Sequence, residues 1–512
     1  MNKTLLQRLF DLRDRDPLAA LKLAEELGES PEEREAGAVV LIDCGDMTNS
    51  GSAVAKGVTV LELLIKERAS PDRWYNLANG LQIRARLAPA ASPDARSDRF
   101  KARVNFGLAI SSKDATHELR SQAATNIGIL LLETSRWVEA LDYFQHAQRL
   151  WPRNGVAAFQ EMRRLMGLAS LFSREEAKYQ SYCHLDALLS RLKELARCVR
   201  DNFDVVERLA GAGALAVVEE TVADAIGIEA EACLDLRDGY LRFIRDENLP
   251  LSIFVSDKEY HARKFDLLTF WSIAERDDNL GQVPEIFAMI NVIKGDFAFA
   301  RQMFFEALSD KQFQETASHG DTLDYAVYGV RFSALTASQR IAFDILDKIA
   351  VLLACHLSIK DAYRIDFMKL WGRRSKNGFE MDPAIQSQLT AGNPGISALH
   401  GLFEDISKDD VRGDGFMEAH KRYRNASTHR FTVLHDEGPG KLKSRSRSIE
   451  HESLQVFSET TLGSLRLARA AIFYCCDAIN FVEGKSGRST DKPHVTLDVP
   501  DHDYIRGRSN RG

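Results

Sequence analysis

A short stretch near the C-terminus combines residue types that could cleave RNA without a metal ion. Arg424 is followed directly by Asn425, and His429 comes four residues after that asparagine. A histidine titrates at about 6.5 when unperturbed, so it can accept or donate a proton near neutral pH. An arginine stays charged and offers a planar fork for phosphate oxygens. The trio predicts an acid/base group in His429, a phosphate-binding group in Arg424, and an amide in Asn425 that orients the imidazole.

The chemistry that these groups could support has three requirements. The 2′-hydroxyl must lose a proton, the phosphorane charge must be stabilised, and the leaving 5′-oxygen must gain a proton. The products would carry a 2′,3′-cyclic phosphate and a 5′-hydroxyl. Asn425 and His429 share one face of a helix, but Arg424 lies roughly 140° from His429 around an ideal helix. The two converge only if the helix ends or bends there, or if a second protomer contributes. We expect neither a metal nor a cofactor.

The spacing alone is not specific, because arginine and histidine recur at similar distances elsewhere. Five pairs fit: Arg422/His429, Arg424/His429, Arg430/His435, Arg445/His451 and Arg488/His494. Of these arginines only Arg424 is followed by asparagine, and it lies on a predicted helix. The pair Arg430/His435 spans a run that looks extended. A plainer interpretation stays open, in which His429 meets a helix C-terminal dipole and Arg424 is a surface charge.

Basic residues gather around the trio, although the whole chain has a net charge of −7. Between residues 420 and 447, eight lysines and arginines face only two acidic residues. The predicted RNA-binding residues are Lys421, Arg422, Tyr423, Arg430, Lys441, Lys443, Arg445 and Arg447. We expect the ring of Tyr423 to stack on a base. The basic residues of segment 441–447 could equally form a solvated loop.

Length and composition favour a helical protein of several domains. The 512 residues suggest two to four domains of about 150 residues each. Helix-forming residues dominate, which favours an all-α fold. Seven cysteines without a CxxC pair argue against a disulfide framework and a structural zinc site. No signal peptide and no apolar run of about 18 residues is recognisable, so we expect a cytoplasmic protein without a membrane partner.

The first half of the chain predicts stacked helical hairpins. Residues 121–154 form the clearest unit, in which small residues fall where two helices must approach and an aromatic residue fills the groove between them. This pattern resembles the tetratricopeptide (TPR) repeat, and the matching residues are Ile127, Gly128, Ala140, Phe144, Ala147 and Pro152. A weaker unit begins near Trp74, with a loop expected at residues 87–98. Residues 1–248 are predicted to form a TPR-like α-solenoid that either binds a peptide or protein or serves as a scaffold.

The second half predicts longer helices. Residues 249–320 are expected to be a helical bridge or the end of the solenoid, with a short strand or extended connection at 251–255 and helices at 265–273, 283–293 and 297–308. A helical bundle is predicted for residues 321–484, and a mobile tail for 485–512. The first strong helix of the bundle is expected at 337–357, which carries an apolar stripe. Further helices are expected at 361–371, 396–406, 416–430 and 453–482, and a loop at 377–393.

A bundle of four or five helices with Arg424, Asn425 and His429 before its final helix resembles the HEPN domain. Many members of that all-helical family are RNases or toxins marked by arginine, four to six residues, then histidine. Residues 343–350 look like the first helix of HEPN domains that follow TPR-like repeats in bacterial conflict systems. The resemblance implies a homodimer with a shared cleft, RNA as substrate, and a toxin or phage-defence role regulated through the solenoid. The alternative is a non-catalytic adaptor whose solenoid and bundle both bind proteins.

Overall fold

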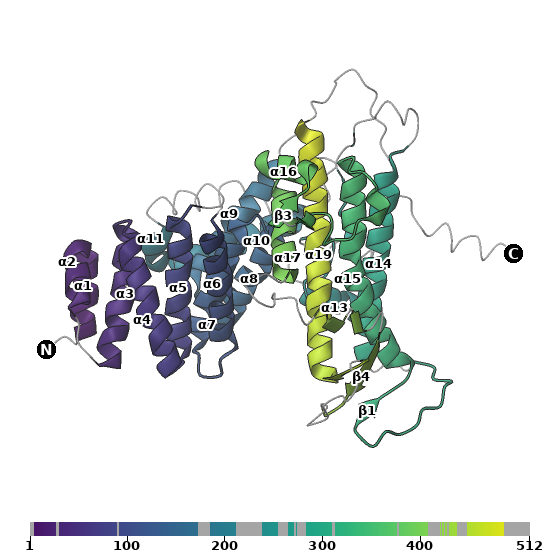
Figure 1. The fold of residues 1–512 in the computed structure, drawn as a ribbon, viewed down its shortest axis with the longest axis horizontal. Coiled ribbons are helices and arrows are strands. Elements are labelled where there is room, and N and C mark those ends of the chain that lie inside the picture. Colours follow the sequence, from purple (N-terminus) through teal and green to yellow (C-terminus); the bar gives the residue numbers. More distant parts are fainter. Residues whose placement is uncertain are drawn as a thin grey trace.

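An arm of stacked helices leads into a bundle of longer helices (Figure 1). This computed structural model describes residues 5–26, 30–89, 92–172, 185–210, 238–253, 265–270, 273, 283–309, 313–375, 378–407, 420, 422–423, 425–426, 430–437 and 448–485. Within these ranges the chain is mainly helical, with two small sheets. The predicted all-α fold class is therefore confirmed. The expected tail at 485–512 lies almost wholly outside the described residues.

The arm consists of helices that pack on their neighbours in chain order. They are α1 (Leu5–Arg15), α2 (Pro17–Glu25), α3 (Pro31–Met47), α4 (Gly51–Glu67), α5 (Pro71–Leu87), α6 (Pro93–Ser111), α7 (His117–Glu133), α8 (Trp137–Leu150), α9 (Gly155–Phe172), α10 (Leu185–Asp201) and α11 (Phe203–Ala210). Several begin with a serine cap before a proline. Ser30, Ser70 and Ser92 each accept a backbone N–H of the first turn. This cap-then-proline signal fixes where each helix starts.

The hairpin of α7 and α8 is packed as the spacing of its residues predicted. A Cβ atom on Gly128 would lie 2.5 Å from Cε1 of Phe144, so the aromatic ring requires a glycine opposite it. Ala140 and Ala147 are fully buried. The Asn154 side chain caps α9 and donates to a serine and a threonine of α7, which joins the hairpin to the next helix. The hairpin stacking is thus observed, while the assignment to TPR repeats stays a prediction.

Two expectations for the arm and its end were wrong. The loop expected at residues 87–98 is shorter, because α6 begins at Pro93 and the buried Asp98 side chain forms a two-bond ion pair with Arg84. The helix expected at 265–273 is absent from the described residues of that segment, which form only a short 3-10 turn at 265–266. At 251–255, where either a strand or an extended connection was expected, the described residues 251–253 form bends and no strand.

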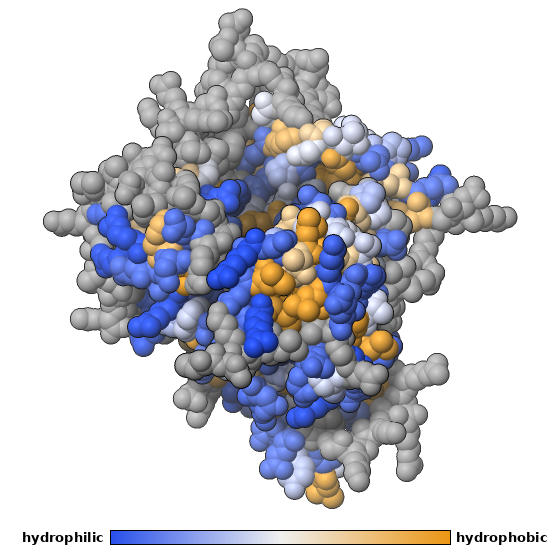
Figure 2. Space-filling model, turned by 90° about the vertical axis from the view of Figure 1, so that its left-hand side faces the viewer, coloured by the Kyte–Doolittle hydropathy of each residue, from blue (hydrophilic) through white to orange (hydrophobic). Residues whose placement is uncertain are grey.

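The outer end of the arm carries apolar surface. Figure 2 views the molecule from the side of α1 and α2 and shows apolar atoms gathered near the centre among hydrophilic ones. Leu18 on α2 is 63% exposed.

The bundle is built on α19 (Leu454–Lys485), the last helix among the described residues, against which α14 (Glu285–Leu308), α15 (Val330–His356) and α17 (Pro394–Ile406) pack. The short helices α13 (Gly239–Asp246) and α16 (Pro383–Thr390) lie beside α14 and α17. The two helices expected at 283–293 and 297–308 are one continuous helix, α14. A single hydrophobic core runs from α8 and α9 of the arm to α19, so arm and bundle are joined by buried apolar surface.

Two predictions for the segment between α15 and α17 were wrong. The helix expected at 361–371 is only a 3-10 turn, η4 (Ala362–Arg364), and Trp371 is buried beyond it. The loop expected at 377–393 contains β3 (Gly378–Met381), which pairs with β2 (Gly372–Ser375), and then α16. Asp382 caps α16 ahead of Pro383, so the proline that suggested a loop marks a helix start.

A small sheet that the sequence did not predict lies at one end of the bundle. Its strands are β1 (Ala326–Val327), β4 (Phe431–His435) and β5 (Ile449–Ser453), in the order β1-β4-β5. β1 is antiparallel to β4, whereas β5 is parallel to β4 with Phe431 opposite Ile449. The pairing is long-range, which periodicity along the chain does not reveal.

The arm and the bundle are also joined by buried charges. Asp405 on α17 accepts two hydrogen bonds of 2.8 Å from Arg103 on α6 and one of 2.6 Å from Arg136, which precedes α8. The indole Nε1 of Trp137 donates to Asp477 on α19 at 2.7 Å. These contacts dock the arm against both α17 and α19.

In the part of the chain that the structure describes, no helix combines the length and apolar character needed to cross a membrane.

Candidate functional site

The structure describes part of the predicted site. Of the predicted catalytic residues, the structure describes Asn425, whereas Arg424 and His429 lie outside the described residues. Of the predicted RNA-binding residues, Arg422, Tyr423 and Arg430 are described. The others lie outside the described residues: Lys421, Lys441, Lys443, Arg445 and Arg447. The described neighbours define the frame that surrounds the motif.

His420 anchors the start of the motif to two helices of the bundle. Its Nδ1 lies 2.6 Å from Oγ of Ser464 on α19, and its carbonyl accepts a hydrogen bond of 3.3 Å from Gln339 on α15. Gly463 makes room for the ring, because a Cβ there would lie 2.8 Å from Cε1 of His420. Desolvation by burial lowers the pKa of His420 to about 4, so its ring is neutral. His420 is therefore a structural anchor.

Tyr423 belongs to the core. Its side chain is among the largest fully buried ones, at 1% exposure, and its ring lies 5.1 Å from the ring of Phe457 on α19. Its hydroxyl donates to the carboxylate of Glu452 on β5, and burial raises the pKa of the phenol above its usual value. The expectation that Tyr423 stacks on a base was wrong, because its faces are occupied inside the protein.

Arg422 is exposed, but two carboxylates of β5 oppose its charge. Its Nε lies 3.0 Å from Glu450 and its Nη2 lies 3.6 Å from Glu452. These glutamates fall just beyond residue 447, so the local charge count from the sequence missed them. Any phosphate that binds Arg422 must compete with them. Its role in RNA binding stays a prediction.

The motif stands where a helix gives way to a strand. Residues 422–423 and 425–426 are helical, and the N–H of Arg430 donates to the carbonyl of Ala426 at 2.9 Å. β4 then begins at Phe431. Ala426 is buried, whereas Asn425 is half-buried and lies about 200° from Tyr423 around the helix. Asn425 is thus on the side turned away from the core.

Two other histidines from the five Arg/His pairs are engaged within the sheet. His435 is fully buried; its Nδ1 lies 2.9 Å from the carbonyl of Asp324, and its Nε2 lies 2.9 Å from Nδ1 of His451. The two residues are sixteen apart and meet only through the parallel pairing of β4 and β5. Because the sequence predicted no sheet, it gave no signal for this contact.

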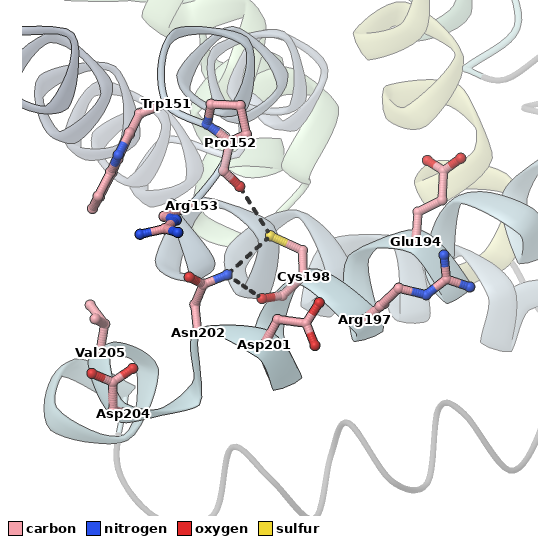
Figure 3. Close-up of a pocket in the computed structure, with 10 residues that line it drawn as sticks. All are labelled: Trp151, Pro152, Arg153, Glu194, Arg197, Cys198, Asp201, Asn202, Asp204 and Val205. Carbon is pink, nitrogen blue, oxygen red and sulfur yellow. Dashed lines mark hydrogen bonds between the residues drawn. The ribbon is translucent and has the colours of Figure 1, made fainter.

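A cleft of about 790 Å³ lies away from the motif, in the arm. It is lined by the turn after α8 and by α10 and α11, including Pro152, Cys198 and Asn202 (Figure 3). The Cys198 thiol donates to the carbonyl of Pro152 at 3.5 Å, and burial raises the pKa of this thiol. Such a thiol is a weak nucleophile near neutral pH. The described residues that line this cleft form no recognisable catalytic arrangement.

The C-terminal part thus belongs to the class of helical bundles. Its helices pack against α19, and a polar Arg-Asn-x₃-His sequence precedes that helix. Residues 278–481 match the family model described as LA2681-like HEPN. The chain therefore carries a HEPN domain, and the matched segment includes α14 as well as the later helices of the bundle. No curated protein and no solved structure matches the chain. The family points to a function in the nuclease, RNA-related or toxin class.

Proposed function

We propose that this protein is a metal-independent endoribonuclease. In this proposal His429 transfers protons, Arg424 binds the scissile phosphate and Asn425 orients the imidazole. Deprotonation of the 2′-hydroxyl lets its oxygen attack phosphorus, and the 5′-oxygen leaves with a proton, which gives a 2′,3′-cyclic phosphate and a 5′-hydroxyl. The guanidinium would offset the charge that develops on the phosphorane oxygens.

The helix-to-strand junction is the observation that supports this proposal most. A straight helix would hold Arg424 and His429 roughly 140° apart. The helical residues 425–426 are followed by β4 at Phe431, and the sequence places His429 between the two. We propose that the chain bends there and brings the side chains of Arg424 and His429 together.

The packing around the motif supports the proposal in a second way. The anchors at His420 and Tyr423 tie one side of the segment to α15, α19 and β5. These anchors hold one side of the segment against the bundle, and Asn425 lies on the other side. Catalytic groups need support of this kind, because small displacements cost large factors in rate.

We further propose that two copies pair to form a shared cleft, that the enzyme acts in the cytoplasm as a toxin or defence effector, and that the arm regulates it. The buried contacts of Asp405 and Trp137 support regulation, because they join the arm to helices of the bundle. The molar mass in solution tests the dimer. A ligand of the arm that changes the rate of RNA cleavage would test regulation.

The decisive experiment incubates the purified full-length protein with a labelled single-stranded RNA in excess EDTA. We expect cleavage with cyclic phosphate ends, detected by mass spectrometry. His429→Ala should lower the rate about 10²- to 10⁴-fold, whereas His319→Ala, a control histidine that is 39% exposed, should not. Cleavage that EDTA abolishes, or that persists in His429→Ala, would rule out this mechanism. A wild type that is tolerated on expression and leaves RNA intact would favour the adaptor.

A further inference from the structure

The parallel pairing of β4 and β5 returns the chain to the motif. β4 ends at His435, and the connection that follows contains the basic residues of segment 441–447. The N–H of Phe431 donates to the carbonyl of Ser448 at 2.9 Å, so the end of this connection lies at the start of β4. An antiparallel hairpin would have placed it at the other end of β4, roughly 13 Å away for a five-residue strand.

This topology gathers several groups around one residue, Phe431. Arg430, which is exposed, precedes it in the chain, and His429 precedes Arg430. On the neighbouring strand, Arg447 directly precedes Ser448 in the sequence. Ser448, which follows the basic segment in the sequence, and Arg430, which follows His429, thus both lie at the start of β4.

Phe431 itself is presented to solvent. Its side chain is 69% exposed, which is unusual for a phenylalanine in a strand. Its backbone is fixed by the bond to Ser448 and by pairing with Ile449 in the register of β4 and β5. A ring held on a fixed backbone loses little conformational entropy when a flat ligand stacks on it.

We propose that Phe431 is the stacking platform for a nucleobase of the single-stranded RNA substrate, next to the phosphate that is cleaved. This inference rests on the proposed function for the identity of the substrate. It assigns to Phe431 the role that the sequence suggested for the buried Tyr423. Phe431 is a positioning residue, which holds the nucleotide while the motif acts on the phosphate.

Charge favours RNA over a second copy of the chain as the occupant. Arg430, which precedes Phe431, is basic and exposed, and the sequence of segment 441–447 before Ser448 is positive in a chain with a net charge of −7. A second copy would bring the same positive segment to the same place. A polyanion with a flat base matches both the cations and the exposed ring.

The test measures binding of a fluorescein-labelled single-stranded RNA to full-length protein carrying His429→Ala, so that the RNA stays intact. Adding Phe431→Ala should raise Kd about 5- to 150-fold, the cost of losing one stacked base. Phe431→Tyr should keep Kd near the parent value, because a ring remains. The slope of log Kd against log salt should stay constant, since a phenyl ring releases no counterions.

The matched control is Phe299→Ala, which removes a ring that is 53% exposed on α14. It should leave Kd unchanged. An unchanged Kd in Phe431→Ala, or a loss that Phe431→Tyr does not restore, would overturn the inference. A change in the molar mass of the protein in solution that accompanies the loss of binding would also overturn the inference, because Phe431 would then pack against a second copy of the chain.

Failure of this inference and failure of the proposed function give different results. If the wild type cleaves RNA in EDTA and Phe431→Ala binds RNA as tightly as its parent, only the stacking role is wrong. If the wild type cleaves nothing but Phe431→Ala still weakens binding, Phe431 stacks on RNA and the nuclease proposal is wrong. With cleavage and stacking both present, Phe431→Ala should raise KM more than it lowers kcat.

Discussion

Removing the carboxylate of Asp405 should loosen the junction between arm and bundle. Asp405 is buried and accepts three hydrogen bonds from Arg103 and Arg136, at 2.8, 2.8 and 2.6 Å. Burial alone raises the pKa of this carboxyl, but the two guanidinium groups together lower it below its usual value. Asp405 is therefore ionised in the folded protein, and Asp405→Ala leaves two cations without their shared anion.

The loss of stability in Asp405→Ala depends on which partners Arg103 and Arg136 retain. Breaking a buried ion pair by removing one partner costs about 3–5 kcal/mol. Arg136 retains Glu139 through bonds of 2.8 and 2.6 Å, and Arg103, whose side chain is 18% exposed, can turn toward water. The cost should thus lie at the lower end, about 3 kcal/mol. The neighbouring Glu404 lies 3.7 Å from Arg96 in a more exposed pair, so Glu404→Ala should cost only about 0–1 kcal/mol.

Hydrogen exchange of the amides in α8 and α17 measures this local stability without assuming two-state unfolding of a long chain. An opening free energy lowered by about 3 kcal/mol corresponds to exchange about 150-fold faster in Asp405→Ala. The Glu404→Ala control should exchange within a few-fold of the wild type. Similar exchange in the two variants would refute the view that the buried triad holds the arm to the bundle.

Two further substitutions test the anchors on α19 and the pH dependence of the junction. Gly463→Ala should lower RNA cleavage and stability, because overpacking against His420 costs about 1–3 kcal/mol and outweighs a helix-propensity gain of about 1 kcal/mol. The control Gly295→Ala has open space at its Cβ and should gain stability instead. Equal melting temperatures of the two variants would contradict this prediction. Burial raises the pKa of Asp142 to about 6, although Arg469 lowers it in part. Since the unfolded value is about 3.9, the folded state binds the extra proton, and stability should fall as pH rises from about 4 through 6. Asp142→Asn should remove this loss of stability, which is about 1–3 kcal/mol. If the melting temperature of the wild type does not fall between pH 5 and 8 relative to that of the variant, the prediction is wrong.

Local signals in the sequence predicted the helices and their packing in much of the arm. Gly128 and Phe144 could be matched across a hairpin because one small and one large residue must face each other at a close helix contact. Serine caps followed by proline mark helix starts, and the same signal at Asp382 and Pro383 was misread as a loop because the surrounding residues are polar. At Asp382 and Pro383 the signal for a helix start was present in the local sequence, but the prediction gave more importance to the polar residues around it.

The sheet beside the motif could not be predicted in this way. β4 and β5 are short, and their partners are set by pairing between residues about eighteen apart rather than by alternation within each strand. Without the sheet, Tyr423 looked like a solvent-facing aromatic beside basic residues. Its burial depends on Phe457 and Glu452, which come from two elements that follow it in the chain. The predicted roles of Arg424 and His429 rest on the sequence and the family match, since neither is among the described residues.

One helix links the arm to the motif. Near one end of α19, Tyr474 donates to the Glu139 carboxylate of the arm, and Asp477 accepts from the indole of Trp137. Toward its other end, Phe457 and Ser464 hold the residues before the motif. The twenty residues between 457 and 477 span about 30 Å of continuous helix. Because a packed helix moves as a rigid body more readily than it bends, a ligand of the arm that acts on the motif must shift α19 between two positions.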